Sequence, residues 1–197
     1  MSYSERYARA LAIAARAHHG QLRKGTDVPY VTHPVHVARI LDLHGFSEDL
    51  VLAGLLHDVL EDTDVPEDEI ARQVGAEVAK LVRAVTEKKS EGGAERPWEV
   101  RKDEQLAHLA SATADVLALK AADALHNATE TLRDVREQGA ATAFARFKRG
   151  PAPSIGYYRR IAELCTARLD GHAIARELAA VVADLDRAAQ DSAGDPV

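Results

Sequence analysis

The apolar positions of the chain recur with the spacing of α-helices along almost its whole length. Ala, Leu, Arg and Glu dominate these segments, and clusters of β-branched residues are few. Capping residues, prolines and glycines suggest where the segments begin and end. We expect helices over residues 4–19, 34–43, 47–62, 66–75, 76–88, 98–109 and 114–138, and two more that meet near Gly171.

This pattern predicts an all-α fold, a single helical bundle of about eight to ten helices. Between the helices we expect loops at residues 20–33, 89–97 and RGPAPSIG (149–156). The segments show no repeat and no low-complexity linker, so we expect one domain over residues 1–189 and a frayed tail over 190–197.

The composition narrows the class of protein. The chain has 197 residues, of which 46% are hydrophobic and 28% charged, and these proportions are typical of one ordinary folded domain. Its net charge of −6 gives no support to nucleic-acid or anionic-membrane binding. A single cysteine, Cys165, favours a reducing compartment, and no apolar run approaches the roughly 20 residues of a membrane span. Without an apolar leader segment either, we expect a cytoplasmic protein.

The end of the segment 47–62 carries candidate chemistry. After an apolar run, His57, Asp58, Glu61 and Asp62 follow closely. In a continuous helix these four would span an arc of about 140° on one side. Burying one imidazole and three carboxylates together is costly unless a cation binds them, so a divalent metal would explain the cluster. The alternative is an acidic helix end exposed to solvent.

Two further segments place polar residues among apolar ones. His33 lies at the start of the helix expected over 34–43, where a cap or core histidine is the ordinary alternative to a ligand; we interpret the neighbouring His36 as structural. Asp123 and Asn127 lie four residues apart in the apolar stripe of the longest helix. A metal ligand would explain Asp123, and two hydrogen-bonded core residues would explain the pair equally well.

Together these residues follow the order H…HD…D, which is the pattern of the HD superfamily. Within it the chain resembles the RelA/SpoT-type (p)ppGpp hydrolases, including their small stand-alone members. The resemblance rests on AHHGQLRKGTDVPYVTHP (17–34), LLHDVLEDT (55–63) and LKAADALHN (119–127), with a softer match at VRAVTEKK (82–89). The Glu-Asp pair after HD, combined with the upstream Arg-Lys, is the specific part of the match.

The resemblance implies a single HD-domain bundle with one metal, most often Mn²⁺, held by His33, His57, Asp58 and Asp123. It implies that Glu61 and Asp62 are the catalytic acids, which position and deprotonate water. In such enzymes water displaces the 3′-pyrophosphate of the nucleotide. The chain is too short for the synthetase domains of the long members, so hydrolysis without synthesis is expected.

The same resemblance assigns nucleotide contacts. Arg23 and Lys24 would contact the substrate and its phosphates, and Asn127 would lie near the ribose and base. Lys102 with its neighbour Arg101, and Tyr157, fall where stand-alone members have extra phosphate or sugar contacts. The expected partner is therefore a small-molecule nucleotide, with no nucleic acid or membrane, and a homo-oligomer is left open.

Departures from the family pattern leave the identity of the nucleotide substrate open. Glu130 stands where long members have a small hydroxyl residue, and the loop between Arg23-Lys24 and His33 is one residue longer than in many bacterial members. One alternative is an HD phosphohydrolase for another nucleotide, such as ppApp or NADPH; the Glu-Asp pair and the Arg-Lys loop argue against the dNTPase and monophosphatase branches. A second alternative is a non-catalytic nucleotide-binding module, and a third, a nucleic-acid binder, finds no support in the charge balance.

Overall fold

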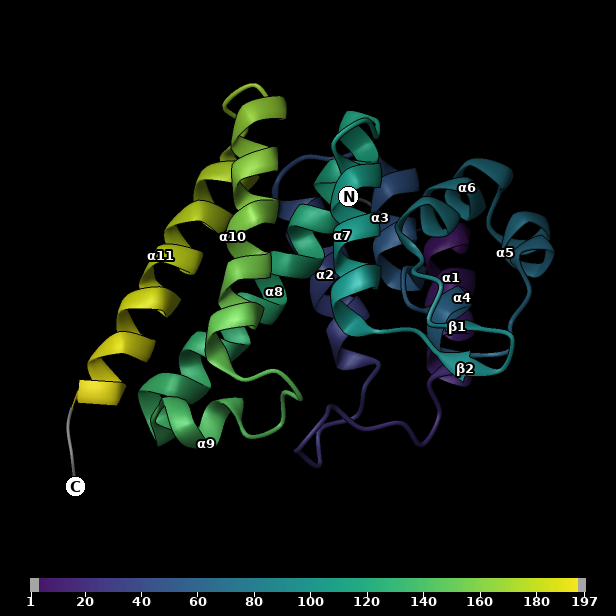
Figure 1. Cartoon of the computed structure of the whole chain (residues 1–197). Helices are drawn as coiled ribbons and strands as arrows, with labels where there is room; N and C mark the ends of the chain where they lie inside the picture. Colours follow the sequence, from purple (N-terminus) through teal and green to yellow (C-terminus); the bar gives the residue numbers. More distant parts are fainter. Residues whose placement is uncertain (1–3, 195–197) are drawn as a thin grey trace. The chain divides into compact units, whose positions relative to one another are not determined.

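The chain folds almost entirely into helices, as expected (Figure 1). The computed structural model describes residues 4–194, without the side chains of the last two. In these residues the elements are α1 (Glu5–Ala17), α2 (Thr32–Leu43), α3 (Glu48–Leu56), α4 (Val59–Asp62), α5 (Glu67–Gln73), α6 (Ala76–Val85), β1 (Ser90–Glu91), β2 (Ala94–Glu95), α7 (Trp98–Leu109), α8 (Ala114–Gln138), α9 (Ala140–Phe144), α10 (Pro151–Arg168) and α11 (Ala173–Gly194).

The described chain divides into two compact units, one up to Lys120 and one from Ala121 onward, and α8 contributes residues to both. We describe each unit by itself. The expectation of one domain over residues 1–189 stays a prediction.

The first unit is built around α3. Every residue of α3 from Leu50 to Leu56 is buried, because α1, α2 and α6 all pack against this helix. Ser47 caps its first turn by accepting a hydrogen bond from the backbone N–H of Leu50. Arg6 of α1 ties the same end to the rest of the unit through an ion pair with Glu48 at 2.9 Å.

The helix expected over residues 47–62 is interrupted, which corrects our prediction. α3 ends at Leu56, and α4 is a separate single turn from Val59 to Asp62. The ring of His57 makes its own backbone contact at the break, since its Nδ1 donates to the carbonyl oxygen of Gly54 at 2.9 Å. The four polar residues are therefore distributed over a helix end, a turn and a new helix rather than one helix face.

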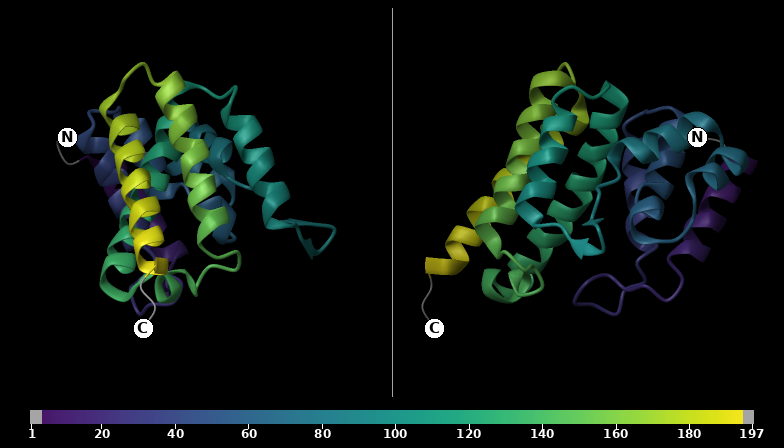
Figure 2. Two further views of the ribbon diagram at one scale, coloured as in Figure 1. Left: turned by 60° about the vertical axis from the view of Figure 1, so that its left-hand side comes forward. Right: turned by 45° about the vertical axis from the view of Figure 1, so that its right-hand side comes forward.

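Smaller differences arise at loops. The expected loop 89–97 contains the antiparallel pair β1–β2, which lies directly before α7 (Figure 2). The helix expected to reach residue 88 ends at Val85. Most of RGPAPSIG is helical, because α10 begins at Pro151 and proline suits a first helical turn.

In the second unit, α10 and α11 run antiparallel, side by side, and α9 packs against α11 (Figures 1 and 2). α9 was not expected; the positive φ of Gly139, 79°, lets the chain turn between α8 and α9. α11 continues to Gly194, through residues in which we expected a frayed tail, because these residues extend a helix that is already formed and need no new nucleation. Residues 195–197 of the expected tail lie outside the described part.

None of the helices in residues 4–194 has the length and apolar character needed to cross a bilayer.

Candidate metal centre and active site

His33, His57 and Asp58 converge in the first unit. In the described part of the chain, these three side chains form a group whose ligand atoms all lie within 4.8 Å of one another. The two Nε2 atoms are 3.2 Å apart, and Oδ2 of Asp58 lies 3.1 Å from Nε2 of His57 and 3.6 Å from that of His33. Both imidazoles are buried, and Asp58 is largely buried.

A close helix contact brings these three side chains together. His33 belongs to the first turn of α2, and His57 follows the last residue of α3. A Cβ atom added at Gly54 would lie only 2.8 Å from Leu41 and 3.1 Å from the backbone of Ala38, so the glycine allows α2 and α3 to approach closely. The sequence thus positions two histidines from separate helices at one point.

The hydrogen bond of His57 to Gly54 also determines which ring nitrogen carries a proton. A carbonyl oxygen can only accept, so the bond to Gly54 places a proton on Nδ1 of His57. When the ring is neutral, its lone pair is on Nε2, the ring nitrogen that faces His33 and Asp58. This arrangement, in which the second ring nitrogen donates to the backbone, is typical of metal-binding histidines. The residues present therefore fit a divalent metal.

Tyr30 joins this group to the acidic pair, and we did not predict it. Its hydroxyl donates to Oδ2 of Asp58 at 2.6 Å and lies 3.4 Å from Oδ2 of Asp62. The ring of buried His18 lies 4.9 Å from the Tyr30 ring, and Gln21, which bonds His18, also donates to the backbone oxygen of Asp62. Tyr30 lies in the motif PYVTH, but its partners Asp58 and Asp62 are 28 and 32 positions further along the chain, so the local sequence does not indicate these contacts.

Glu61 and Asp62 share one cation. Nζ of Lys89 lies 3.0 Å from Oε1 of Glu61 and also forms a close ion pair with Asp62. The backbone N–H of Glu87 donates to the other Glu61 oxygen at 2.9 Å. Burial raises the pKa of the Glu61 carboxyl above its usual value, and Asp58 adds to the rise, while Lys89 and the Glu87 amide oppose it. A carboxyl of this kind is suited to accept a proton.

Arg23 and Lys24 lie on a folded loop rather than a loose one. The backbone N–H of Arg23 donates to Val28, and that of Tyr30 donates to Gln21, so the loop closes on itself. The guanidinium of Arg23 lies 5.8 Å from the centre of the Tyr30 ring, within cation–π range, and Lys24 is exposed. The loop therefore carries two cations, and one of them, Arg23, lies beside the residue that bonds Asp58.

Lys102 lies on α7 in an ion cluster. Its Nζ pairs closely with the buried carboxylate of Glu87, which also pairs with Arg101 at 2.9 Å. Burial lowers the pKa of Lys102, and Lys120 lowers it further, against the effect of Glu87. The expected contact of Lys102 with substrate stays a prediction.

The other predicted residues belong to the second unit. Asp123 and Asn127 lie one turn apart on α8, and Nδ2 of Asn127 donates to Oδ1 of Asp123 at 2.6 Å. Tyr157 of α10 is buried, with its ring beside that of Tyr158. Metal binding by Asp123 and substrate binding by Asn127 and Tyr157 stay predictions.

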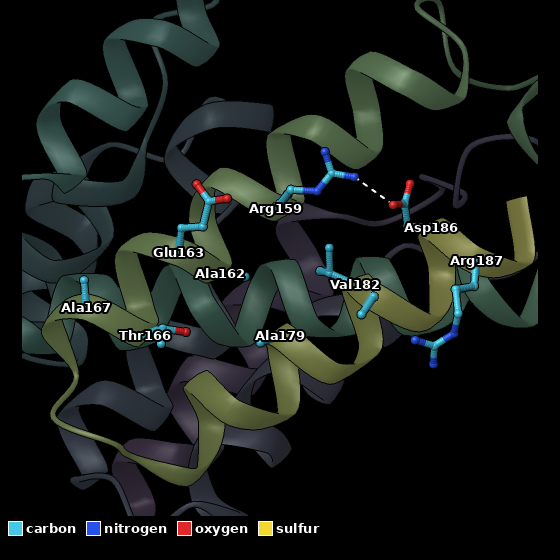
Figure 3. Close-up of a pocket in the computed structure, with 10 residues that line it drawn as sticks. Arg159, Ala162, Glu163, Thr166, Ala167, Ala179, Val182, Asp186 and Arg187 are labelled. Atoms are coloured by element: carbon cyan, nitrogen blue, oxygen red, sulfur yellow. Dashed lines mark hydrogen bonds and ion pairs between the residues drawn. The ribbon is translucent and has the colours of Figure 1, made fainter. Parts of the chain in front are cut away.

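The second unit also contains a cavity of about 570 Å³ between α10 and α11 (Figure 3). Its walls are mainly small side chains, and an ion pair between Arg159 and Asp186, 2.8 Å long, lies at its side. None of the residues predicted for the site lines it.

The fold and the convergent histidines and aspartate agree with comparison to known proteins. A family model described as "HD domain" matches residues 10–147, which is more than half of the chain. The chain belongs to the HD-domain family, and the expectation drawn from the H…HD…D order is confirmed at this level.

Particular relatives lie within this family. The chain is 38% identical over 125 residues to guanosine-3′,5′-bis(diphosphate) 3′-pyrophosphohydrolase MESH1 of Danio rerio. The aligned region covers 62% of this chain and 64% of that protein. It is 38% identical over 123 residues to a GTP pyrophosphokinase of Myxococcus xanthus, covering 60% of this chain but only 16% of that protein. The solved structure described as a metazoan ortholog of SpoT that hydrolyzes ppGpp matches 95% of this chain and 97% of its own, with a TM-score of 0.73 and 27% identity.

Proposed function

We propose that the chain is a metal-dependent phosphohydrolase that removes the 3′-pyrophosphate of (p)ppGpp. The observation that carries this proposal is the convergence of His33, His57 and Asp58 next to the Glu61–Asp62 pair, with Tyr30 bonded to Asp58 and close to Asp62. The 3′-pyrophosphohydrolase activity in the name of the Danio rerio relative supports it.

We propose that His33, His57 and Asp58 hold one divalent metal, with Asp123 as the fourth protein ligand, and that this metal is Mn²⁺. Two imidazoles and two carboxylates form a mixed nitrogen and oxygen donor set that suits Mn²⁺. When bound, the metal supplies a Lewis acid that lowers the pKa of water and offsets negative charge on the phosphate.

The protein side chains then have separate tasks. A water oxygen attacks the phosphorus atom that is bonded to the 3′ oxygen of the ribose. The bond between this phosphorus and the 3′ oxygen breaks, and the products are pyrophosphate and GDP or GTP. Glu61 and Asp62 take the proton of the attacking water and handle the proton of the leaving oxygen. The raised pKa of Glu61 supports this task, because its carboxylate is more basic than an ordinary one.

We propose that Arg23 and Lys24 bind the nucleotide phosphates. Arginine offers a flat pair of donors and lysine a compact charge, so together they suit a highly anionic ligand. Asn127 would contact the ribose and base. Substrate contacts from Lys102 and Tyr157 rest on the sequence resemblance alone.

A different nucleotide substrate for the same chemistry is the second candidate. Glu130, which stands where the long family members tend to have a small hydroxyl residue, accepts a hydrogen bond from Arg133 at 2.8 Å. An altered base pocket would favour ppApp or NADPH over ppGpp.

A reducing location such as the cytoplasm agrees with the single cysteine, Cys165, which is buried and forms no disulfide. We therefore propose a cytoplasmic enzyme whose partner is a small nucleotide.

The test is pyrophosphate release from ppGpp by the purified chain with Mn²⁺, then with a chelator, beside ppApp and NADPH. Mn²⁺-dependent release from ppGpp that stops on chelation is the expected result. Turnover of ppApp or NADPH alone would move the function to the second candidate. A chain that binds nucleotide but turns over none of them would indicate a non-catalytic module.

A further inference from the structure

Glu87 connects the acidic pair to a group of cations. It follows α6 in the chain, and its backbone N–H donates to Oε2 of Glu61 at 2.9 Å. Its own side chain is 4% exposed. One residue therefore contacts Glu61 through its main chain and the cations through its side chain.

Both oxygens of the Glu87 carboxylate are occupied. Oε2 lies 2.9 Å from Nη1 of Arg101, and Oε1 forms a close ion pair with Nζ of Lys102. The two cations are consecutive residues of α7, and their side chains are themselves largely buried. A buried carboxylate paired on both sides is held in one orientation, because each of its oxygens is bound by its own charged donor.

The charges around Glu87 agree with this geometry. Burial alone would raise the pKa of its carboxyl, but Lys102, Lys120 and Arg101 outweigh burial and lower it. Glu87 is therefore ionised at neutral pH and stays paired.

We propose that Glu87 is a positioning residue: its ion pairs with Arg101 and Lys102 hold the loop after α6, and the Glu87 amide in turn holds the carboxylate of Glu61. The inference rests on the proposed function, in which Glu61 acts on the proton of the attacking water. It gives Arg101 and Lys102 the task of fixing Glu87 instead of contacting the nucleotide.

The kinetic test compares Glu87→Gln, Lys102→Met and the double variant in the Mn²⁺-loaded full chain. A misplaced Glu61 lowers turnover without weakening binding, so we expect kcat to fall about tenfold in each single variant while KM stays within about twofold. The double variant should be no slower than the slower single variant, since both remove one connection. The matched control is Glu104→Gln. Glu104 lies on α7 like Lys102, is exposed, and pairs with Arg96, which precedes the helix, so its loss should leave kcat unchanged.

Two kinetic outcomes overturn the proposal. An unchanged kcat in a folded Glu87→Gln chain would do so, and so would a Lys102→Met chain whose KM rises at constant kcat, because that result assigns Lys102 to the substrate. Lys102→Met answers the question if Glu87→Gln does not fold.

A second readout does not depend on activity. Hydrogen exchange of the Glu87 amide should be at least about tenfold faster in Lys102→Met than in wild type, and unchanged in Glu104→Gln. Equal exchange in Lys102→Met and wild type would refute the positioning. A wild-type chain that hydrolyses no nucleotide would instead refute the proposed function, and amide exchange would still decide the role of Glu87.

Discussion

The Tyr30 hydroxyl donates a 2.6 Å hydrogen bond to Oδ2 of Asp58, the carboxylate oxygen that faces both histidines. Hydrogen-bond partners of metal ligands orient the ligand, and their loss weakens metal binding by about 10- to 100-fold. We expect Tyr30→Phe to bind Mn²⁺ about tenfold more weakly in a calorimetric titration. Tyr158→Phe in the second unit serves as the control, and equal affinities in the two variants would contradict this role of Tyr30.

Asp58 and Glu61 should respond differently to substitution. We expect Asp58→Ala to lose bound metal and activity together, because it removes one of the three convergent ligands. We expect Glu61→Gln to retain metal and lose about 100-fold or more of kcat, the usual contribution of a proton-transfer group. Metal content and turnover of the same samples are the measurements, with Asp68→Asn, in an exposed ion pair on α5, as the control. Wild-type turnover in Glu61→Gln would exclude Glu61 as a catalytic residue.

Lys89 should set the pH range of activity. Burial raises the pKa of Glu61 and Lys89 opposes the rise, so removing the Lys89 charge raises this pKa further. In the proposed mechanism the ionised Glu61 carboxylate accepts the proton, so activity should be lost as pH falls through this pKa. Lys89→Met should therefore move the acid limb of kcat/KM to higher pH. The shift should be modest, since Lys89 is partly exposed and its charge is screened by solvent.

The neighbouring lysine gives the control for this prediction. Lys88 pairs with the exposed Glu91 in β1 and has no ion pair with Glu61 or Asp62 among the described contacts. Lys88→Met should leave the acid limb in place. Identical shifts in both variants would mean that general charge, not the contact of Lys89, controls the profile.

Gly54 should be intolerant of a side chain. A Cβ atom there meets Leu41 at 2.8 Å and the backbone of Ala38 at 3.1 Å, so α2 or α3 must shift. Overpacking costs about 1–3 kcal/mol, which exceeds the about 0.4–1 kcal/mol that replacing a helical glycine by alanine gains. We therefore expect Gly54→Ala to be less stable in urea unfolding. Gly156→Ala, where nothing lies within 4 Å, should be slightly more stable, and the same sign in both variants would refute the close contact.

Cys165 should be chemically inert in the folded chain. It is fully buried, and burial raises the pKa of its thiol to about 12. At pH 8 this leaves on the order of a thousandfold less thiolate than in a free cysteine. We expect alkylation by iodoacetamide to be slow in the native protein and fast in denaturant, as followed by mass spectrometry. Similar rates under both conditions would show that Cys165 is accessible.

The helix bounds could be predicted best where local residues define them. Pro97 precedes α7 and Gly139 follows α8, and both helices have the predicted bounds. The break between α3 and α4 could not be predicted in this way, because the residues on both sides favour a helix. It depends on the bond of His57 to Gly54 and on the tertiary contacts of both residues.

The site residues were likewise predicted only in part from the sequence. The order of the motifs identified His33, His57 and Asp58, and the structure brings these three together. Lys89 and Glu87 were not predicted as site residues, because they reach Glu61 from 28 and 26 positions away along the chain. Contacts over this sequence distance depend on tertiary packing, and hydrophobic periodicity predicts only local elements.

The β1–β2 hairpin has a consequence for how the length of such chains can vary. Its four paired residues are exposed, and its two turn glycines have open space around them. Extra residues at this tip would extend into solvent. Between His57 and Asp62, by contrast, a single inserted residue would rotate the acidic pair away from the proposed metal ligands. Length changes should therefore accumulate at the hairpin and be absent from the six positions from His57 to Asp62.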